Sequence, residues 1–294
     1  MPRVLVSGSI SYDTLLRIDA DFRSTMRTKT ESLSVGYHCQ ERHQTFGGIA
    51  ANIAFHLARQ SIDASPVAAV GNDFQAYADW MDANNVDRSL LSHVDDEPTA
   101  QVYILSDSHE NQVLALYLGA MKYSRDIRLS NEKADLAVVG PDERDAFMQR
   151  VKDFDRIGVP IMLDPGQSIT SLSADDIRTA LAKSRWLVVN EFECSFLESL
   201  TGATALDISR LVEALVVTRG ADGCSIFFGR EKINVDSVSP DSVVDPTGCG
   251  DTFRAGLITG MLSGSDLADA ARLGASLAAE TLAHLGAQWQ RATP

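Results

Sequence analysis

The chain has 294 residues, of which 45% are hydrophobic and 22% are charged, as is typical of a globular protein with a sizeable core. The formal net charge of -14 excludes a broad attraction to nucleic acid or anionic membranes, and no lysine and arginine run gives a local exception. The four cysteines lie far apart, which excludes a cysteine zinc site and a disulfide framework. With no leader-like segment and no apolar run long enough to cross a bilayer, we expect a cytoplasmic protein.

Short runs rich in valine, leucine and isoleucine alternate along the chain with helical patterns. The runs predict buried strands at residues 3–9, 66–70, 135–140, 160–164, 186–190 and 214–218. Helices are expected at residues 49–60, 74–83, 143–157 and 175–183, and the last third is predicted to be helical over 251–262 and 266–285. The alternation predicts an α/β fold, with a mostly parallel central sheet flanked by helices on both faces.

Two segments, at about residues 14–46 and 98–120, interrupt this alternation. Both look like antiparallel strands with one exposed face, and in the second the runs QVYILSD and QVLALYL flank a turn at residues 108–111. We expect them to form a small β-sheet, inserted in a single domain of residues 1–294, that closes over a ligand as a lid. An exposed apolar sheet face fits either a monomer or a homodimer formed through the lid.

The strongest chemical signal is the run DPTGCGDTF at residues 245–253, which follows an extended segment and opens a helix. Gly248 and Gly250 let the backbone turn N–H groups outward, and the helix adds its positive end. With Cys249 between them, these residues form a site for a phosphate oxygen or for the charge that develops on one. The carboxylate of Asp251 would face the same pocket. Taken alone, the pattern also fits a loop that ends in an Asp N-cap.

DPTGCGDTFRAG resembles the C-terminal signature of the PfkB, or ribokinase-like, carbohydrate kinases, in which a D-T-x-G-A-G-D core precedes a long helix. Here Pro246 stands between the Asp and the Thr, and Cys249 takes the usual alanine position. The resemblance implies a ribokinase-like fold and in-line transfer of a phosphoryl group from ATP. In that mechanism Asp251 is the base, and the backbone of Gly248, Cys249 and Gly250 is the anion hole.

Two N-terminal motifs resemble the parts of this family that bind the sugar. FGGIAANIA resembles G-G-x-x-x-N-x-A, in which Gly47 and Gly48 let a ligand approach and Asn52 offers a donor and an acceptor to hydroxyl groups. SGSISYD resembles G-x-x-x-x-D, so Ser9 and Asp13 would lie at the substrate and Asp13 would accept hydrogen bonds from a ribose diol. Without the family, these runs fit a helix start with a small packing face and a turn.

Two further motifs resemble the family's nucleotide site. NEFE at 190–193 resembles N-x-x-E, whose Glu193 helps hold Mg²⁺ through water, and TRGADG at 218–223 resembles the T-x-G-x-x-G turn. The resemblance assigns ATP to Asn190, Thr218, Gly220, Gly223, Thr247, Gly248 and Gly250. Family members often bind K⁺ near the anion hole, so a K⁺ ion is compatible with it. Without the family, the runs fit an acidic helix start and a hairpin turn.

The substrate is inferred from a closer resemblance. GAM at 119–121, LDPGQ at 163–167 and the Pro-Thr-Gly form are similar to the bacterial adenosine kinase branch, which places Gln167 and the lid residue Tyr117 near the base. The lid has few phenylalanines, and apolar stacking discriminates weakly between rings, so several nucleosides are expected to fit. The predicted reaction is phosphorylation of the 5′-hydroxyl of adenosine or of a broader set of nucleosides.

Two alternatives stay open: a sugar kinase of the same family that acts on ribose or a fructose-type ketose, and a catalytically silent member that binds ligands. The sequence lacks G-x-x-x-x-G-K-[ST], the protein-kinase motifs and a G-x-G-x-x-G after a strand, and its histidines lack metal-ligand spacing. Arg254, one turn into the last motif's helix, would assist the anion hole or lie on the surface. Cys249 at a helix start predicts a lowered thiol pKa and reaction with alkylating agents; otherwise it only replaces alanine.

Overall fold

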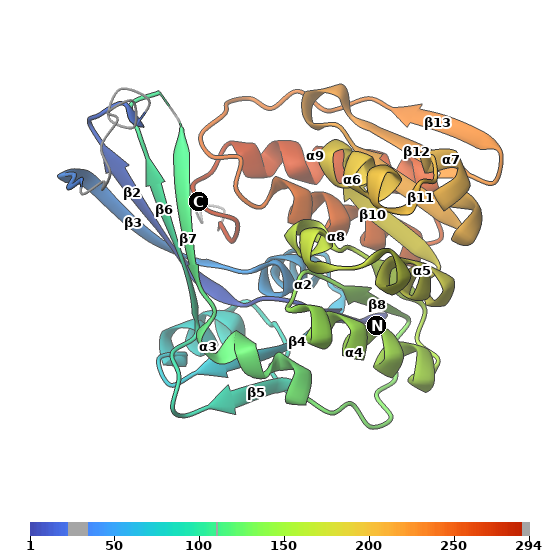
Figure 1. Cartoon of the computed structure of the whole chain (residues 1–294), viewed down its shortest axis with the longest axis horizontal. Coiled ribbons are helices and arrows are strands. Elements are labelled where there is room, and N and C mark those ends of the chain that lie inside the picture. The colour runs from blue at the N-terminus through green and yellow to red at the C-terminus, as the bar shows by residue number, and fades with distance from the viewer. Residues whose placement is uncertain (23–34, 110, 290–294) are drawn as a thin grey trace.

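The computed structural model describes residues 1–22, 35–109 and 111–289. Within them the main sheet has nine strands in the order β13-β12-β11-β10-β9-β8-β1-β4-β5 (Figure 1). Their bounds are β1 Arg3–Ser7, β4 Asp63–Gly71, β5 Leu91–Val94, β8 Leu136–Val139, β9 Ile161–Leu163, β10 Trp186–Asn190, β11 Ala214–Thr218, β12 Cys224–Phe228 and β13 Glu231–Val235. The pairs from β11 to β5 are parallel, which confirms the expected sheet. The antiparallel strands β12 and β13 lie between the predicted strand at 214–218 and the predicted helix at 251–262, where no element was predicted, and the run TRGADG joins β11 to β12 as a hairpin turn.

Helices cover both faces of this sheet, as expected (Figure 1). One face carries α2 Ile49–Arg59, α3 Gln75–Ala83, α8 Cys249–Leu262 and α9 Leu267–Leu282; the other carries α4 Arg144–Ile157, α5 Ala174–Lys183, α6 Glu191–Thr201 and α7 Ala205–Ile208. Short 3-10 turns are η1 Gly119–Asp126, η2 Gly166–Ser171, η3 Ser209–Leu211 and η4 Gly220–Asp222. In β1, Val4 and Val6 pack on the first layer and Leu5 on the second. A strand buried on both faces reads as one continuous apolar run, which is why these strands could be predicted.

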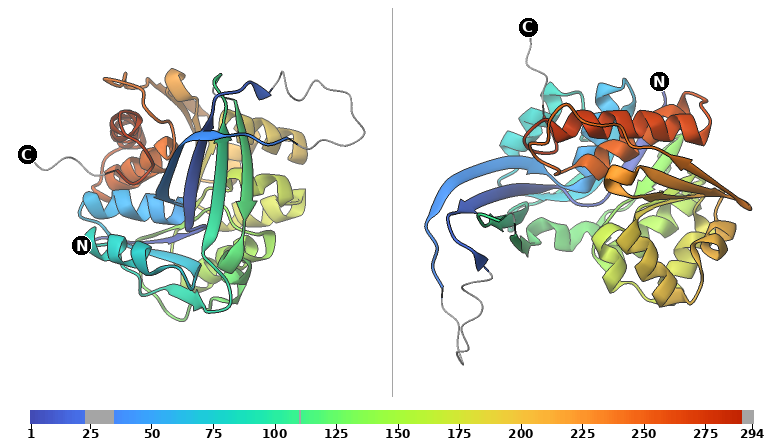
Figure 2. Two further views of the ribbon diagram at one scale, coloured as in Figure 1. Left: turned by 90° about the vertical axis from the view of Figure 1, so that its left-hand side faces the viewer. Right: turned by 90° about the horizontal axis from the view of Figure 1, so that it is seen from above.

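A second sheet stands off the main one (Figure 2). Its order is β3-β2-β6-β7, with β2 Ser11–Ile18, β3 Cys39–Gly47, β6 Ala100–Ser106 and β7 Gln112–Tyr117. We call these four strands the lid, after the role predicted for them. The pairs β2–β3 and β6–β7 are antiparallel as expected, but β2 and β6 pair in parallel, because they come from two distant segments. Residues 23–34 of the first predicted lid segment and Glu110 of the predicted turn lie outside the described residues.

The topology brings the sequence motifs to one edge of the main sheet. Strands β1, β8, β9, β10 and β11 are parallel, so the loops that follow them meet at their carboxyl ends, where open α/β sheets bind ligands. Helix α8 packs on α2 and α9, and β2 of the lid begins four residues after β1 ends. In the ranges that the structure describes, no helix is both long and apolar enough to span a bilayer.

Candidate active site

The loop before α8 is fixed by glycine geometry and by one aspartate. Gly248 has a φ of +80°, and a Cβ there would lie 2.3 Å from the Cβ of Ala287, so a side chain is excluded on both counts. Asp245 Oδ1 accepts a hydrogen bond from Thr247 N (2.9 Å), and Asp245 Oδ2 accepts one from Gly286 N (2.9 Å). The first residue of DPTG therefore braces the loop against the chain beyond α9.

Three backbone N–H groups at the start of α8 are available to an anion. The first N–H groups of an α-helix have no acceptor within the helix. Cys249 N donates to Pro246 O (3.3 Å), whereas the described part of the chain offers no backbone acceptor to the N–H groups of Gly248, Gly250 and Asp251. The available donors are therefore those of Gly248, Gly250 and Asp251, at the positive end of α8, and of the expected trio from Gly248 to Gly250 only Cys249 N already has an acceptor.

Asp251 is buried beside this backbone and has a titration range suited to a base. Its Oδ2 accepts a hydrogen bond from Asn52 Nδ2 at 2.7 Å. Burial raises the pKa of Asp251 to about 6, against the hydrogen bond from Asn52 and the charge of Arg254, while the negative charge of Asp13 adds to the rise. A general base works best when its pKa lies near the operating pH.

Asp13 lies close to Asp251, at the foot of the lid. Its Oδ1 accepts a hydrogen bond from Ser11 Oγ at 2.8 Å. A Cβ on Gly47 would lie 2.1 Å from Asp13 Oδ2, and one on Gly48, whose φ is +91°, would lie 2.5 Å from a backbone carbon of the loop after β1. Burial raises the pKa of Asp13 to about 6, the Ser11 hydrogen bond opposes this, and Asp245 adds to it. Gly47 thus makes room for this carboxylate, and Gly48 makes room for the backbone that carries it.

Ser9 and Asn52 hold protein groups instead of presenting open groups to a ligand. Ser9 Oγ accepts from Ile49 N (3.2 Å) and Ser9 O accepts from Ala50 N (3.0 Å), so Ser9 caps the start of α2. Asn52 uses Nδ2 for Asp251, and its Oδ1 accepts from Gln288 Nε2 at 3.0 Å. The expected donor of Asn52 therefore serves the base, its acceptor is taken by Gln288, and no sequence motif pointed to Gln288.

A buried ion pair lies under the anion hole. Arg254 donates to Asp164 Oδ1 (2.6 Å) and to Gly250 O (3.0 Å), and its side chain is only 8% exposed. The alternative of a surface arginine is thus wrong. Burial raises the pKa of Asp164 to about 7, the charge of Arg254 opposes it, and Glu193 and Asp251 add to it. Arg254 therefore ties the loop peptide to the end of β9.

The NEFE motif forms the start of α6. Asn190 Oδ1 accepts from Glu193 N (2.8 Å), and Glu193 Oε2 accepts from Asn190 N (2.8 Å), which is a capping box. The simpler interpretation, an acidic helix start, is therefore correct as local structure. Glu193 is also buried and acts electrostatically on Asp164 and Arg254, so its carboxylate belongs to the same cluster.

A cavity of about 540 Å³ opens beside the start of α8. Of the seven predicted nucleotide residues it is lined by four, Thr218, Gly220, Gly223 and Gly250, but not by Asn190, Thr247 or Gly248. Its other walls come from residues 235–243 and from α8 and α9, with Val238, Val243, Phe253, Ala275, Ala278 and Leu282. In the sequence, only the regular spacing of small residues along α9 pointed to this wall of the cavity. A largely apolar cavity next to exposed N–H groups suits a nucleotide base and its phosphates.

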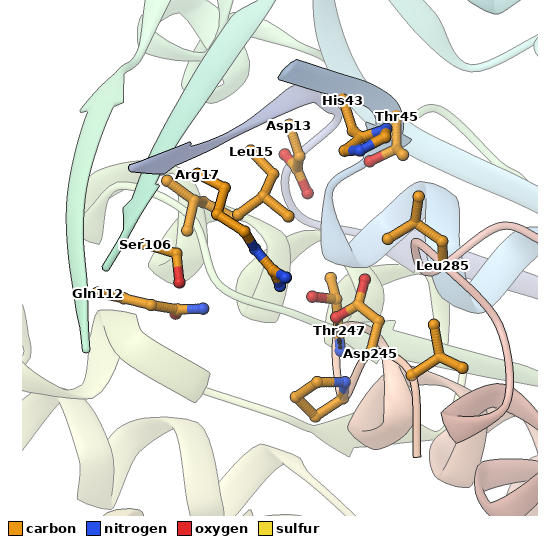
Figure 3. A pocket seen from close by; sticks show the side chains of 13 residues that line it. Asp13, Leu15, Arg17, His43, Thr45, Ser106, Gln112, Asp245, Thr247 and Leu285 are labelled. Atoms are coloured by element: carbon orange, nitrogen blue, oxygen red, sulfur yellow. Dashed lines mark hydrogen bonds between the residues drawn. The ribbon is translucent and has the colours of Figure 1, made fainter. Parts of the chain in front are cut away.

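A second, smaller cavity lies between the lid and the DPTG loop (Figure 3). Asp13, Leu15 and Arg17 line it from alternate positions of β2, and Thr247 and Asp245 line it from the loop. Its remaining walls are His43, Thr45, Ile104, Ser106, Gln112, Val244, Pro246 and Leu285. This cavity meets the Asp251 cluster at Asp13.

Two predicted base contacts lie outside both cavities. Gln112 lines the lid cavity, so its neighbours at two-residue spacing, Leu114 and Leu116, share its face of β7, and Tyr117 points to the opposite face. There Tyr117 donates to Glu97 Oε2 (3.0 Å). Tyr117, the predicted base contact, therefore lies on the wrong face, and Leu116, one residue earlier, lies on the cavity face. Gln167 is exposed on η2 and lines neither cavity.

Cys249 is not the activated thiol that its helix position predicted. Burial raises its pKa to about 11, and the nearby Asp245 and Asp251 act in the same direction. Sγ lies 3.7 Å from Ala278 O of α9. Burial and two carboxylates outweigh the helix end here, so the structure favours the simple replacement of alanine.

This position yields a direct chemical prediction. At pH 7.5, Cys249 is expected to react with iodoacetamide at least about tenfold more slowly than a free thiol, because the thiolate is the nucleophile. Peptide mass spectrometry after timed alkylation measures the rate, with exposed Cys39 as the internal control. Cys249→Ala should keep wild-type turnover, and fast alkylation of Cys249 would contradict the raised pKa.

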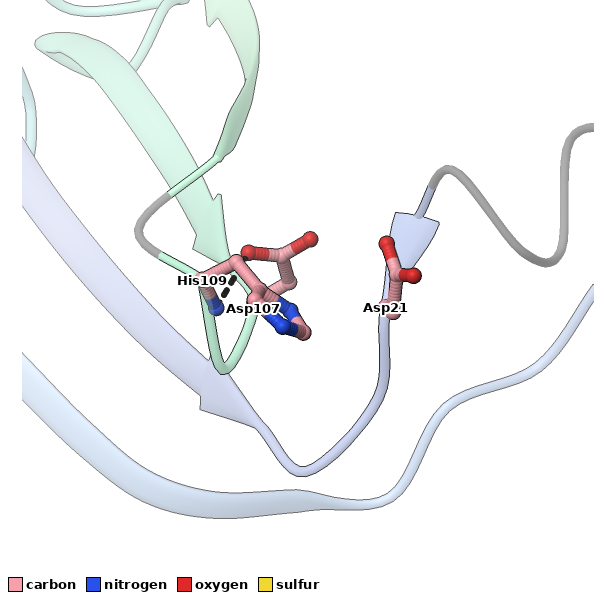
Figure 4. Close-up of side chains that lie close together, drawn as sticks. All are labelled: Asp21, Asp107 and His109. Atoms are coloured by element: carbon pink, nitrogen blue, oxygen red, sulfur yellow. Dashed lines mark hydrogen bonds between the residues drawn. The ribbon is translucent and has the colours of Figure 1, made fainter.

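A third group, at the tip of the lid, resembles a metal site but is already satisfied. Asp21, Asp107 and His109 lie close together (Figure 4). The Asp107 carboxylate accepts hydrogen bonds from the backbone N–H groups of Phe22, His109 and Asn111 and from the Asn111 side chain. These hydrogen bonds hold the pKa of Asp107 well below its usual range, although burial opposes them. Asp107 therefore fastens the turn.

Comparison with known proteins identifies the family. The family model for pfkB family carbohydrate kinases matches residues 9–292. The chain belongs to this family. The predicted resemblance and the ribokinase-like fold are thereby confirmed, and the protein is an ATP-dependent phosphotransferase with an alcohol acceptor.

Individual family members of known structure or activity align over almost the whole chain. A nucleoside kinase of Methanothermobacter thermautotrophicus is 31% identical, over 97% of this chain and 91% of its own length. The structure of a Burkholderia thailandensis nucleoside kinase in complex with inosine has a TM-score of 0.89 and 33% identity, over 97% of this chain and 92% of that one. A ribokinase of Bacillus subtilis is 26% identical, over 98% of this chain and 95% of its own length.

Proposed function

We propose that the protein transfers the γ-phosphoryl group of ATP to the 5′-hydroxyl of a nucleoside, with adenosine as one member of a broader substrate set. The observation that carries this proposal is the place of Asp251. Asp251 directly follows Gly250, which lines the cavity suited to a nucleotide, and it is in electrostatic range of Asp13, which lines the cavity under the lid. The N–H groups of Gly250 and Asp251 have no backbone acceptor among the described residues. The nucleoside kinases among the similar proteins support the same substrate class.

In this mechanism the residues around Asp251 have separate tasks. Asp251 accepts the proton of the attacking hydroxyl, and the N–H groups of Gly250 and Asp251 bind a phosphoryl oxygen as charge develops on it. Asp13 accepts hydrogen bonds from the ribose diol, which turns the 5′-carbon toward Asp251. Arg254 keeps the Gly250 peptide in place through its carbonyl oxygen.

The carboxylates of this cluster fit a magnesium ion. Mg²⁺ prefers oxygen ligands and keeps several of its waters, so it is held by few protein groups. Glu193 and Asp251 both act electrostatically on Asp164, and one carboxylate oxygen of Glu193 is used for its helix cap. We infer that Glu193 holds the hydrated ion through water, and that the ion, when bound, neutralises phosphate charge.

The lid cavity favours a nucleoside over a free sugar. Along β2, Asp13 is followed on the same face by Leu15 and then by Arg17. Leu15 pairs with Ile104 of β6, and Arg17 pairs with Ser106. Four residues of a strand cover about 13 Å, so the face continues well past the length of one sugar ring. The order of carboxylate, apolar side chains and polar side chains matches the diol, ring face and polar edge of a nucleoside.

A substrate panel tests the proposal against its alternatives. The coupled ADP-release assay, with ATP and Mg²⁺, compares adenosine, inosine, guanosine, cytidine, ribose and fructose. We expect turnover on nucleosides. Turnover on free sugars alone would establish the sugar kinase, and binding of a nucleoside without turnover of any compound would establish the silent family member.

The diol contact makes a separate prediction. Asp13→Asn is expected to raise the nucleoside KM by about 10- to 100-fold, because hydrogen bonds to a charged group are worth about 1.5–3 kcal/mol. The KM for ATP should stay within about twofold of wild type. Steady-state kinetics with each substrate varied checks this, and 2′,3′-dideoxyadenosine, which lacks the diol, should show no further loss with the variant. An equal rise in both KM values would contradict the assignment.

Binding of K⁺, the cytoplasmic location, and the choice between a monomer and a homodimer stay predictions. Every residue of the edge strand β7 is exposed, and Leu114 and Leu116 are 54% and 59% exposed, so this edge is available to a second copy or to a bound ligand. Light scattering of the free protein separates the two oligomeric states.

A further inference from the structure

The chain beyond α9 folds back over α2 and reaches the active site from behind. We call residues 284–289 the C-terminal segment. His56 Nε2 of α2 is hydrogen-bonded to Ala287 O at 2.8 Å, and Arg59 NH1 donates to Trp289 O at 2.9 Å. Between these two anchors, Gln288 is only 8% exposed and extends toward α2 and α3.

The hydrogen bonds of Gln288 have one possible direction. Trp80 Nε1 on α3 can only donate, and it donates to Gln288 Oε1 at 3.0 Å. The Nε2 group therefore faces the other way, where it donates to Asn52 Oδ1 (3.0 Å) and to the hydroxyl oxygen of Tyr77. Tyr77 in turn donates its proton to Gly47 O at 2.8 Å, so it is an acceptor toward Gln288.

The orientation of the Gln288 amide fixes the orientation of Asn52, which in turn contacts Asp251. Because Asn52 Oδ1 accepts from Gln288, its Nδ2 must face Asp251 Oδ2, to which it donates at 2.7 Å. We propose that Gln288 is a positioning residue, which fixes the Asn52 amide so that its NH₂ group, and not its oxygen, meets Asp251. The inference rests on the proposed role of Asp251 as the base.

The orientation decides which protonation state of the base is favoured. A donor stabilises the carboxylate, the form that can accept a proton, whereas a carbonyl oxygen in the same place would repel the carboxylate and stabilise the acid. Two charged groups act electrostatically on Asp251: Asp13 from the lid and Arg254 from α8. Asp251 also interacts with Asp164 after β9, and Glu193 of α6 acts on both Asp164 and Arg254. Since these include three carboxylates, a donor at Asp251 matters.

A solely structural role for Gln288 makes a different prediction. If Gln288 only docks the C-terminal segment, its loss should lower the melting temperature without moving the pH dependence of catalysis. If it orients Asn52, its loss lets the amide turn over, and the base becomes harder to deprotonate. The acid limb of the pH profile separates the two roles, because kcat/KM reports the pKa of the base in the free enzyme.

The test uses two substitutions that act at different points of the chain of hydrogen bonds. Gln288→Met removes the donor to Asn52, and Trp80→Phe removes the N–H that fixes Gln288 while keeping an aromatic ring. For Gln288→Met we expect kcat about tenfold lower, a nucleoside KM within about twofold, and an acid limb about one pH unit higher. Trp80→Phe should move both quantities the same way by a smaller amount, and it carries the test alone if Gln288→Met does not fold.

Arg59→Met is the control, because it loosens the C-terminal segment at Trp289 O without touching the hydrogen bonds to Asn52. It should lower the melting temperature and leave the acid limb in place. Wild-type kcat and an unmoved acid limb in both test variants would overturn the inference, as would an equal shift in Arg59→Met. If the wild-type protein turned over no compound, the proposed function would fail. The inference would then be decided by carbon-13 NMR titration of the Asp251 carboxyl in wild type and the two test variants.

Discussion

Replacing Asp251 by asparagine is expected to lower kcat with nucleosides by about 10²- to 10⁴-fold, the range that a positioned general base contributes. The amide keeps the shape of the side chain and can still accept from Asn52, but it cannot take a proton from the attacking hydroxyl. The nucleoside KM should change little, because Asp13 rather than Asp251 holds the diol. The coupled ADP-release assay measures both constants.

The matched control is Asp175→Asn on α5, which makes the same chemical change at an exposed carboxylate remote from both cavities. It should keep wild-type kinetics. Retention of more than about a tenth of wild-type kcat by Asp251→Asn would exclude Asp251 as the base, since a base contributes at least about 10²-fold. In that case the cluster would act by positioning alone.

The pH dependence of activity and of stability should run in opposite directions at this residue. Because burial raises the pKa of Asp251 to about 6, kcat/KM should rise with pH through that value as the base loses its proton. A folded-state pKa above the unfolded one contributes stability at low pH that is lost as pH rises through about 6. Asparagine carries no charge at any pH, so Asp251→Asn should melt at or above the wild-type temperature at pH 8, with a smaller difference at pH 5.

Thermal unfolding at the two pH values, without ATP or Mg²⁺, checks this and shows that the variant is folded. A melting temperature well below wild type at pH 8 would contradict it and would trace lost activity to lost structure. The expected combination, equal or higher stability with a much lower kcat, is typical of a charged group that is buried for function.

The sequence predicted the parts of this site that follow directly from chain topology. Asp13, Gly47 and Asp251 lie in motifs that follow a strand or open a helix at one edge, and parallel strands bring such positions together whatever the spacing between them. The hydrogen-bond partners of Ser9 and Asn52 could not be predicted in this way, because they depend on how the side chains pack. Gln288 sits in no motif, and its partners on α2 and α3 are more than 200 residues away in the chain.

The base contact at Tyr117 and the reactive alternative at Cys249 both depended on packing that the sequence does not show. A shift of one residue in register moves a side chain of β7 to the opposite face of the sheet. The run QVLALYL has large apolar or aromatic side chains on both faces, so the sequence does not distinguish Tyr117 from Leu116, which lies on the cavity face. At Cys249 the helix end was visible in the sequence, but the burial of the thiol against Ala278 of α9 was not.

Arg254→Met is expected to lower the free energy of unfolding by about 3–5 kcal/mol, the usual cost of removing one partner from a buried ion pair. Asp164 is only 1% exposed at its side chain and would be left without its cation. With burial already raising its pKa to about 7, the carboxyl should take up a proton at neutral pH. Urea unfolding at pH 8 measures the loss, which should be smaller at pH 5.5, where the proton is already bound.

The double variant Asp164→Leu/Arg254→Met separates the stability of this pair from its purpose. Apolar replacements of both partners often restore or exceed the original stability, so urea unfolding should recover most of the loss. Turnover should not recover, because Gly250 O would still lack the hydrogen bond that Arg254 NH1 donates, and the anion-hole peptide would lose its orientation. Recovery of stability and kcat together would show that the pair has no role in the loop. Recovery of stability alone would mean that a costly buried charge pair is retained because it sets the geometry of a single peptide.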